Sequence, residues 1–145
     1  MPQPTPTPIY HITHWRNLPG IVAEEGLSCC ATLKQNRVGY HDIANQDIQS
    51  KRARKRVPCG PGGLLHSYVP FYFAPRSPML YIINQGGPQY PEKQAPVIHL
   101  VSSADAVYAA NQPSVLMPLW CVYVTSPKVG NMAKAEMSGI RPCVV

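Results

Sequence analysis

A basic run followed at once by an aromatic stretch is the part of this sequence whose residue types could most clearly do chemistry. Residues 51–56, KRARKR, carry five lysine and arginine side chains, and a glycine- and proline-rich turn joins them to LLHSYVPFYFAPRSPMLY at residues 64–81. Clustered cations attract phosphates, and aromatic rings can stack on unpaired bases. The pattern therefore predicts a partner that carries both phosphate groups and planar rings.

The charge of the whole chain agrees with such a partner. The 145 residues have a formal net charge of +6 and a sequence pI of about 9.2. Six of the thirteen lysine and arginine residues fall between Arg37 and Arg56, so the positive charge is local. We therefore expect a polyanion as partner, although a solvated, charged helix end would give the same run of residues.

No metal site is expected. His11 and His14 lie close together, but no Asp, Glu or Cys stands near them, and none of the five cysteines forms a C-x-x-C pair. His11 is therefore expected to make a hydrogen bond inside the fold or to contact a ligand. The cysteines are expected to be reduced thiols.

The common phosphate-binding loops are missing from the sequence. It contains neither G-x-x-x-x-G-K-[ST] nor a G-x-G-x-x-G run after a strand. A P-loop and a Rossmann dinucleotide fold are therefore both without support. If the chain binds a nucleotide, it must do so with another fold.

Three short strands are expected to position these residues. IYHIT at 9–13 and PVIHLVSS at 96–103 are rich in β-branched residues and alternate in polarity. The aromatic run at 69–74 is expected to form a third strand that ends before Pro75, because proline removes a ladder donor.

Short helices are expected between the strands. Residues 14–25 have apolar residues at helical spacing, and Gly26 is a typical stop. Residues 41–56 could form a short helix with Ile43 and Ile48 facing inward and its cations near the C-terminus, where the helix dipole favours them.

The remaining chain is less regular, and its length fits one domain. Residues 104–110 are expected to be helical, residues 79–83 fit a helix or a strand, and residues 112–145 show no clear element. Residues 1–8 are expected to be a flexible lead without signal-peptide character. No apolar run reaches the roughly 18 residues of a membrane span, so a cytoplasmic location and no membrane partner are expected.

Three segments together resemble the DarT family, the toxins of bacterial DarT/DarG systems that ADP-ribosylate DNA with NAD. PIYHITHWRNLPGIV, IQSKRARKRVPCGPGGLLHSYVPFYFAPRSPMLY and PVIHLVSSADAV occur in the family's order and cover about residues 8–112. The resemblance implies an α+β, ADP-ribosyltransferase-like fold with a split antiparallel β core and short helices. It implies a DarT-like NAD-binding domain over residues 9–112.

The family resemblance also implies an NAD site, with NAD as co-substrate and no metal. His11 falls where the family contacts the nicotinamide-side ribose, Arg52 falls on the family's catalytic arginine, and residues 33–54 correspond to an element that closes over NAD. The expected cofactor-binding residues are His11, Ile12, Thr13, Gly20, Ser28, Arg52 and Tyr72, with Phe73 as an alternative to Tyr72 for stacking on nicotinamide.

The family's partners are single-stranded DNA and a DarG-like macrodomain antitoxin. The basic run is expected to neutralise phosphates of the DNA, and Tyr and Met side chains near Arg76 are expected to contact its bases. The expected DNA-binding residues are Arg54, Lys55, Arg56, Arg76 and Met79.

The sequence departs from the family toward its end. The family places a catalytic glutamate on a strand well beyond HLVSS, and the surroundings of Glu136 do not match that strand. Residues 113–145 are therefore expected to be a divergent tail that lacks this strand, as in a C-terminally truncated member. Three functions remain open: a DNA ADP-ribosyltransferase, a basic nucleic-acid-binding module without chemistry, and a silent NAD-binding or antitoxin-binding decoy.

Overall fold

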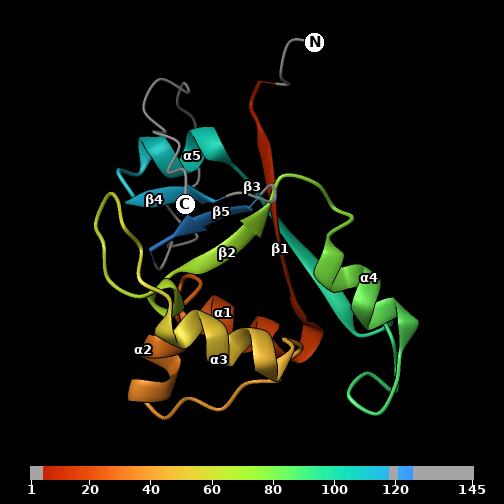
Figure 1. The fold of residues 1–145 in the computed structure, drawn as a ribbon. Helices are drawn as coiled ribbons and strands as arrows, with labels where there is room; N and C mark the ends of the chain where they lie inside the picture. The colour runs from red at the N-terminus through yellow and green to blue at the C-terminus, as the bar shows by residue number, and fades with distance from the viewer. Residues whose placement is uncertain (1–4, 118–120, 126–145) are drawn as a thin grey trace.

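The computed structural model describes residues 5–117 and 121–125, and these form an α+β fold around one antiparallel sheet (Figure 1). The strand order is β3-β1-β2-β5-β4. The strands are β1 Pro8–His14, β2 Val69–Tyr72, β3 Val97–Ser103, β4 Ser114–Met117 and β5 Cys121–Val124. The predicted α+β class is confirmed.

Short helices surround this sheet. Figure 1 shows α1, α2 and α3 grouped beyond one end of β2, α4 beside β3, and α5 near β4 and β5 on the opposite side from α1–α3. The helical segments are η1 Trp15–Asn17, α1 Leu18–Ala23, α2 Cys30–Gln35, α3 Gln46–Arg54, η2 Leu65–Ser67, α4 Pro78–Gln85 and α5 Ala104–Ala109.

Side-chain hydrogen bonds cap the N-termini of α3 and α4. The Asn45 side chain accepts from the backbone N–H groups of Asp47 and Ile48 at the start of α3, and the Ser77 hydroxyl accepts from Leu80 N–H at the start of α4. Such caps satisfy donors that the first turn leaves free. Gly86 ends α4 with φ of 79°, a conformation that suits glycine.

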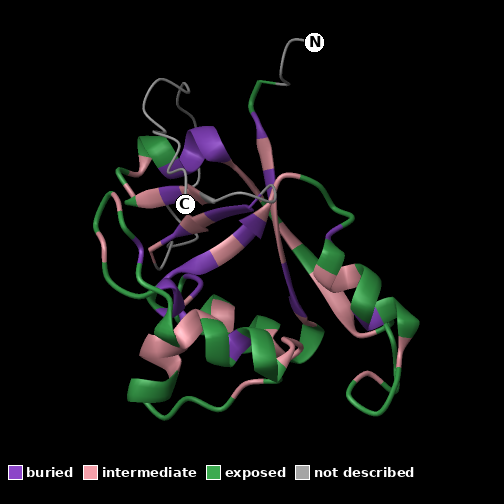
Figure 2. Cartoon of the chain, in the orientation of Figure 1, coloured by how far each residue is buried: buried purple, intermediate pink, exposed green. Residues whose placement is uncertain are grey.

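The core lies between the sheet and α5. Its largest cluster contains Ile9 of β1, Phe71 of β2 and Val124 of β5, all fully buried, together with Val107 of α5. Figure 2 shows buried residues concentrated on β1, β2, β5 and α5, whereas α3 and α4 are mostly exposed. The sheet and α5 therefore enclose the core, and the exposed helices have side chains that can line a site.

Two predicted elements have different bounds in the structure. β2 ends at Tyr72 rather than at residue 74. The predicted helix over residues 14–25 was wrong at both ends, because His14 completes β1 and the helical part divides into η1 and α1, which stops at Ala23.

Several further expectations need correction. α2, β4 and β5 were not predicted, although β5 lies inside the sheet between β2 and β4. Ile48 was expected to face inward but is 49% exposed. Cys29 and Cys30 carry free thiols as expected, whereas Cys59 is disulfide-bonded. Over the described part of the chain, no helix is long and apolar enough to cross a membrane.

Candidate functional site

β1 and β2 touch at one backbone pair and then part. β1 pairs with β3 along its whole length, but its only described pair with β2 is Tyr10 with Tyr72. Extending that antiparallel register by two residues would pair Ile12 with Pro70, and proline has no N–H to donate. The Pro70 carbonyl instead accepts from Nδ1 of His11, at 2.9 Å. A side chain thus occupies the place of a backbone bond, and the strands stay apart.

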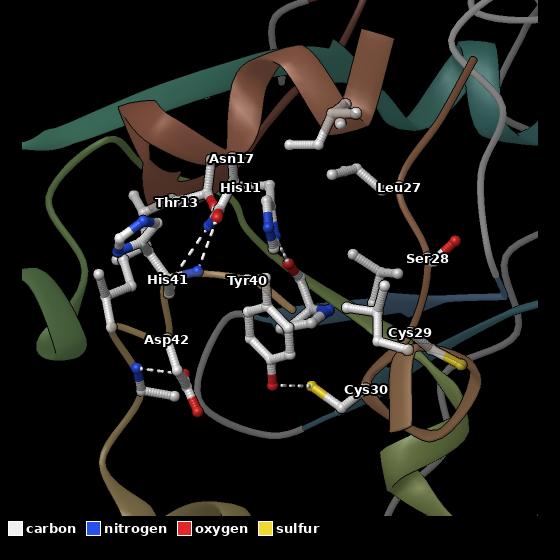
Figure 3. Close-up of a pocket in the computed structure, with 18 of the residues that line it drawn as sticks. His11, Thr13, Asn17, Leu27, Ser28, Cys29, Cys30, Tyr40, His41 and Asp42 are labelled. Atoms are coloured by element: carbon white, nitrogen blue, oxygen red, sulfur yellow. Dashed lines mark hydrogen bonds between the residues drawn. The ribbon is translucent and has the colours of Figure 1, made fainter. Parts of the chain in front are cut away.

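A cavity of about 540 Å³ lies beside this opening, within the range of small-molecule sites. Its walls come from β1, α1, residues 26–30, residues 38–44, α3 and β2 (Figure 3). All seven residues predicted to bind a cofactor line it: His11, Ile12, Thr13, Gly20, Ser28, Arg52 and Tyr72. Phe73, the alternative stacking residue, packs against the core cluster instead.

His11 is a neutral imidazole inside the cavity wall. A carbonyl can only accept, so the bond to Pro70 requires the proton on Nδ1 and leaves Nε2 as an acceptor. Burial lowers the pKa of His11, the Pro70 bond opposes this, and the charge of Arg52 lowers it further. The Phe71 ring lies 5.6 Å from the imidazole. His11 therefore offers a fixed hydrogen-bond acceptor at neutral pH.

Arg52 is held from two sides in the last turn of α3. One terminal nitrogen donates to the Tyr68 carbonyl at 3.3 Å, and the guanidinium carbon lies 5.4 Å from the centre of the Tyr123 ring. Its Nε is buried and has no hydrogen-bond partner among the described residues. The guanidinium is thus oriented by contacts that leave donors for a ligand.

The charge of Arg52 acts on groups in the pocket and beside it. Burial lowers the pKa of His11 and His66, and Arg52 lowers it further. Burial raises the pKa of four other groups, and Arg52 opposes that rise: Tyr40, Tyr72, Cys121 and Tyr123. Burial outweighs this charge at the thiol of Cys121, whose pKa rises to about 11. Burial likewise raises the pKa of the Tyr72 hydroxyl, which therefore remains protonated. An anion entering the pocket meets a partly desolvated positive charge, where attraction is stronger than in water.

Residues 38–44 form a wall that the sequence did not identify residue by residue. Asn17 binds both backbone groups of His41, accepting from its N–H at 2.8 Å and donating to its carbonyl at 2.9 Å (Figure 3). The same Asn17 nitrogen donates to the Thr13 hydroxyl at 3.0 Å. The Tyr40 hydroxyl approaches Cys30 Sγ at 4.0 Å. These residues belong to the segment expected to close over NAD, but only their tertiary contacts show that they face the cavity.

Two carboxylates also line the cavity, Glu24 and Asp42. Asp42 is held by the backbone N–H of Ala44 at 2.8 Å and by the side chain of Gln46 at 3.0 Å. Among the described residues, no three His, Cys, Asp or Glu side chains gather as metal ligands would.

Of the five residues predicted to bind DNA, only one lines the cavity. Met79 lines the cavity, whereas Arg54, Lys55, Arg56 and Arg76 are exposed outside its lining. The basic run therefore continues from the end of α3 along the outer surface, one turn beyond Arg52. Its role in DNA binding stays a prediction.

Several known proteins with similar sequences are DNA ADP-ribosyl transferases. A DNA ADP-ribosyl transferase of Thermus sp. (strain 2.9) is 52% identical over 112 residues, which are 77% of this chain and 52% of that protein. The DNA ADP-ribosyl transferase of Escherichia coli O127:H6 is 39% identical over 124 residues, covering 81% of this chain and 56% of the relative. The chain thus spans about half the length of the relatives that it matches.

Solved structures agree with the sequences. Thermus sp. 2.9 DarT in complex with ADP-ribosylated ssDNA has a TM-score of 0.71 and 50% identity, covering 79% of this chain and 53% of that one. The same DarT in complex with NAD+ has a TM-score of 0.65 and 48% identity, covering 78% and 52%. The sequence profile described as ssDNA thymidine ADP-ribosyltransferase, DarT, matches residues 10–118, most of this chain. With its split sheet and its pocket between β1 and α3, the chain belongs to the DarT family.

Proposed function

We propose that this chain binds NAD as co-substrate and serves the transfer of ADP-ribose to a base of single-stranded DNA. The observation that carries the proposal is the meeting of His11 and Arg52, far apart in sequence, in one cavity at the opening between β1 and β2. Support comes from a relative about half identical to this chain that has been solved with NAD+ and with ADP-ribosylated ssDNA.

Arg52 is assigned to the diphosphate and to charge that develops during transfer. A guanidinium presents its donors in a planar fork that can bind phosphate oxygens in pairs, and it remains cationic at any working pH. Those properties make it a poor proton acceptor. Orienting the reacting groups and stabilising charge are the roles that its fixed position supports.

His11 and Tyr72 are assigned to the nicotinamide side of the cofactor. The free Nε2 of His11 can accept from a ribose hydroxyl, since Nδ1 is already bonded to Pro70. The Tyr72 ring lines the same cavity and can stack on a planar ring. A methyl group added at Gly20 would meet no atom within 4 Å, so this part of the wall leaves room for a ligand.

No residue of this chain is assigned the role of the carboxylate that supports the ribose. We propose that residues 113–145 diverge from the family, as predicted, and that Glu136 does not replace the family's catalytic glutamate; Glu136 lies outside the described residues. Loss of one preorganised catalytic group costs about 100-fold to 1000-fold in rate. A chain in which no carboxylate takes that place is therefore expected to transfer ADP-ribose far more slowly than a relative in which one does.

The biological setting that we propose is a toxin paired with a DarG-like macrodomain antitoxin. This rests on membership of the DarT family.

A transfer assay tests the proposal. Labelled NAD is incubated with single strands containing thymine or guanine, using the wild-type chain, Arg52→Ala and Glu136→Gln. Slow labelling of DNA that disappears in Arg52→Ala is expected. Robust labelling that Glu136→Gln abolishes would show that this glutamate does act, and robust labelling that survives both changes would overturn the assigned site.

Binding measurements separate the other two functions. NAD binding without any transfer indicates a silent NAD-binding module, and salt-sensitive DNA binding without NAD binding indicates a module without chemistry.

A further inference from the structure

Four planar groups lie in a row beside the cavity, and the first and last of them line it. The rings of His41 and His14 lie 4.8 Å apart with an interplanar angle of 23°. The His14 and Trp15 rings follow at 6.1 Å and 26°, and the guanidinium carbon of Arg16 lies 5.5 Å from the Trp15 ring centre. We call these four residues the stacking platform.

Backbone and side-chain bonds hold the stacking platform in place. Asn17 binds both the N–H and the carbonyl of His41, and the Trp15 N–H donates to the Pro96 carbonyl at 2.9 Å. Nδ1 of His14 accepts from the Arg16 N–H at 3.1 Å. These bonds position the backbone of Trp15 and His41 and the ring of His14. Groups that are already positioned lose less conformational entropy when a ligand stacks on them.

The stacking platform continues the cavity wall outward. His41 and Arg16 line the cavity, whereas His14 and Trp15 are outside its lining. Trp15 is 53% exposed, and the core does not need it, because neither core cluster includes it. A large ring that is half exposed, stacked on His14 and placed next to the cavity lining is available to a second group.

We infer that Trp15 and its stacking platform seat an unpaired base of the DNA strand, with Arg16 contacting an adjacent phosphate. The inference deepens the proposed function and rests on it, because it gives the DNA substrate a contact beside the NAD cavity. Every base has a face that can stack on an aromatic ring, so this contact tolerates any sequence.

The charges around the stacking platform fit a nucleotide. Arg16 supplies a permanent cation, and the pKa of His14 is lowered by partial burial and by its neighbours His41 and Arg16, so that its ring stays neutral for stacking; Glu92 opposes this shift. Asp42, the nearby acid of the loop, is already bonded to Ala44 and Gln46. A base therefore meets the neutral rings of Trp15 and His14, and its phosphate meets Arg16.

Tryptophan fluorescence tests this seat directly. The chain has two tryptophans, so Trp120→Phe leaves Trp15 as the only reporter, and circular dichroism confirms that this variant is folded. Oligothymidylate is expected to quench and blue-shift the emission, whereas an abasic strand of the same length supplies phosphates without bases and is expected to leave it unchanged. NAD and AMP are titrated in parallel.

Variants in the otherwise wild-type chain provide an independent readout. Trp15→Leu is expected to weaken oligothymidylate binding by about tenfold or more, the usual effect of losing one stacked base, whereas Trp15→Tyr keeps a ring and most of the affinity. Tyr108→Leu removes a 41% exposed ring on α5 and is expected to bind as the wild type does.

Three results would overturn the inference. Equal quenching of the Trp15 emission by the abasic strand would show that only the phosphates, and no base, contact this surface. Quenching by NAD or AMP but not by oligothymidylate would make the platform an adenine seat. Unchanged DNA affinity in Trp15→Leu would show that Trp15 does not contribute to DNA binding. Failure of the proposed function would be seen separately, as NAD affinity that Arg52→Ala does not change.

Discussion

His11 and Pro70 meet through one hydrogen bond of 2.9 Å, and that bond stands where β1 and β2 would otherwise exchange backbone bonds. The imidazole satisfies a carbonyl that the sheet leaves unpaired, and in return its tautomer is fixed. One contact therefore opens the sheet and prepares an acceptor for the ligand. The predictions below follow from this arrangement and from the groups around it.

Replacing His11 with alanine is expected to weaken NAD binding by about 1–3 kcal/mol, because a polar atom of the ligand would be left unpaired in a partly dry pocket. Isothermal titration calorimetry measures the change. His99→Ala is a matched control, since Nε2 of His99 also bonds a proline carbonyl, that of Pro75, at 2.9 Å, but outside the cavity. Equal losses in both variants would show that His11 acts through the fold alone.

The affinity for NAD is expected to stay constant from about pH 8 down through 6.5, the ordinary pKa of histidine. The pKa of His11 is lowered in the folded protein, so Nε2 remains an acceptor until the solution is more acidic than that. Below the lowered pKa the proton blocks the bond and affinity falls. Titrations across this range check the trend, and His11→Ala should lose the acidic decline. A decline beginning above pH 6.5 in the wild type would contradict the assignment.

DNA binding is expected to favour single strands over duplex and to weaken with salt. If Arg54, Lys55 and Arg56 each neutralise one phosphate, the log–log slope for a single strand is about −2, and each alanine variant reduces it by about 0.7. Lys34→Ala removes an exposed cation from α2 and serves as the control. Fluorescence anisotropy at several salt concentrations gives the slopes. A slope near zero would show that the basic run does not contact the phosphates of the DNA.

Phe71→Ala is expected to lower the free energy of unfolding by about 3–5 kcal/mol, because it leaves a cavity in a closely packed core. The ring is fully buried and also lies against His11, so the variant should lose NAD affinity even where it remains folded. Urea denaturation measures the first effect. Val22→Ala changes a 67% exposed residue of α1 and should alter stability by less than about 0.5 kcal/mol. A small loss in Phe71→Ala would mean that the core can close around the gap.

The elements with strong local patterns could be predicted from the sequence. β1 and β3 have alternating, β-branched runs, and α5 follows a serine cap, so neighbouring residues alone identify them. β4 and β5 have only four residues each and exist because they pair with one another and with β2. α2 has no side-chain cap bond, and its six residues carry no clear periodicity. Contacts distant in sequence decide these elements.

Some residues of the cavity could likewise be predicted from the sequence, and others could not. His11, Arg52 and the other five residues predicted to bind a cofactor were chosen because they stand in motifs that resemble a family. The structure brings all seven to one cavity, and their role there stays a prediction. Asn17 and His41 were missed, since their importance lies in hydrogen bonds that join the end of η1 to the segment of residues 38–44. Pro70 could have been noticed, because a proline inside a strand must face an edge or an opening.

The reach of Arg52 couples ligand binding to protonation. A diphosphate that neutralises the guanidinium also removes part of the field that lowers the pKa of its neighbours. Of the six affected groups only His11 and His66 have ordinary pKa values near neutrality, and a bond from the ligand to Nε2 would keep His11 neutral. His66 is buried in η2 and lies outside the cavity lining. Its affinity for a proton should therefore rise when the pocket fills, so that a histidine untouched by the ligand reports its arrival.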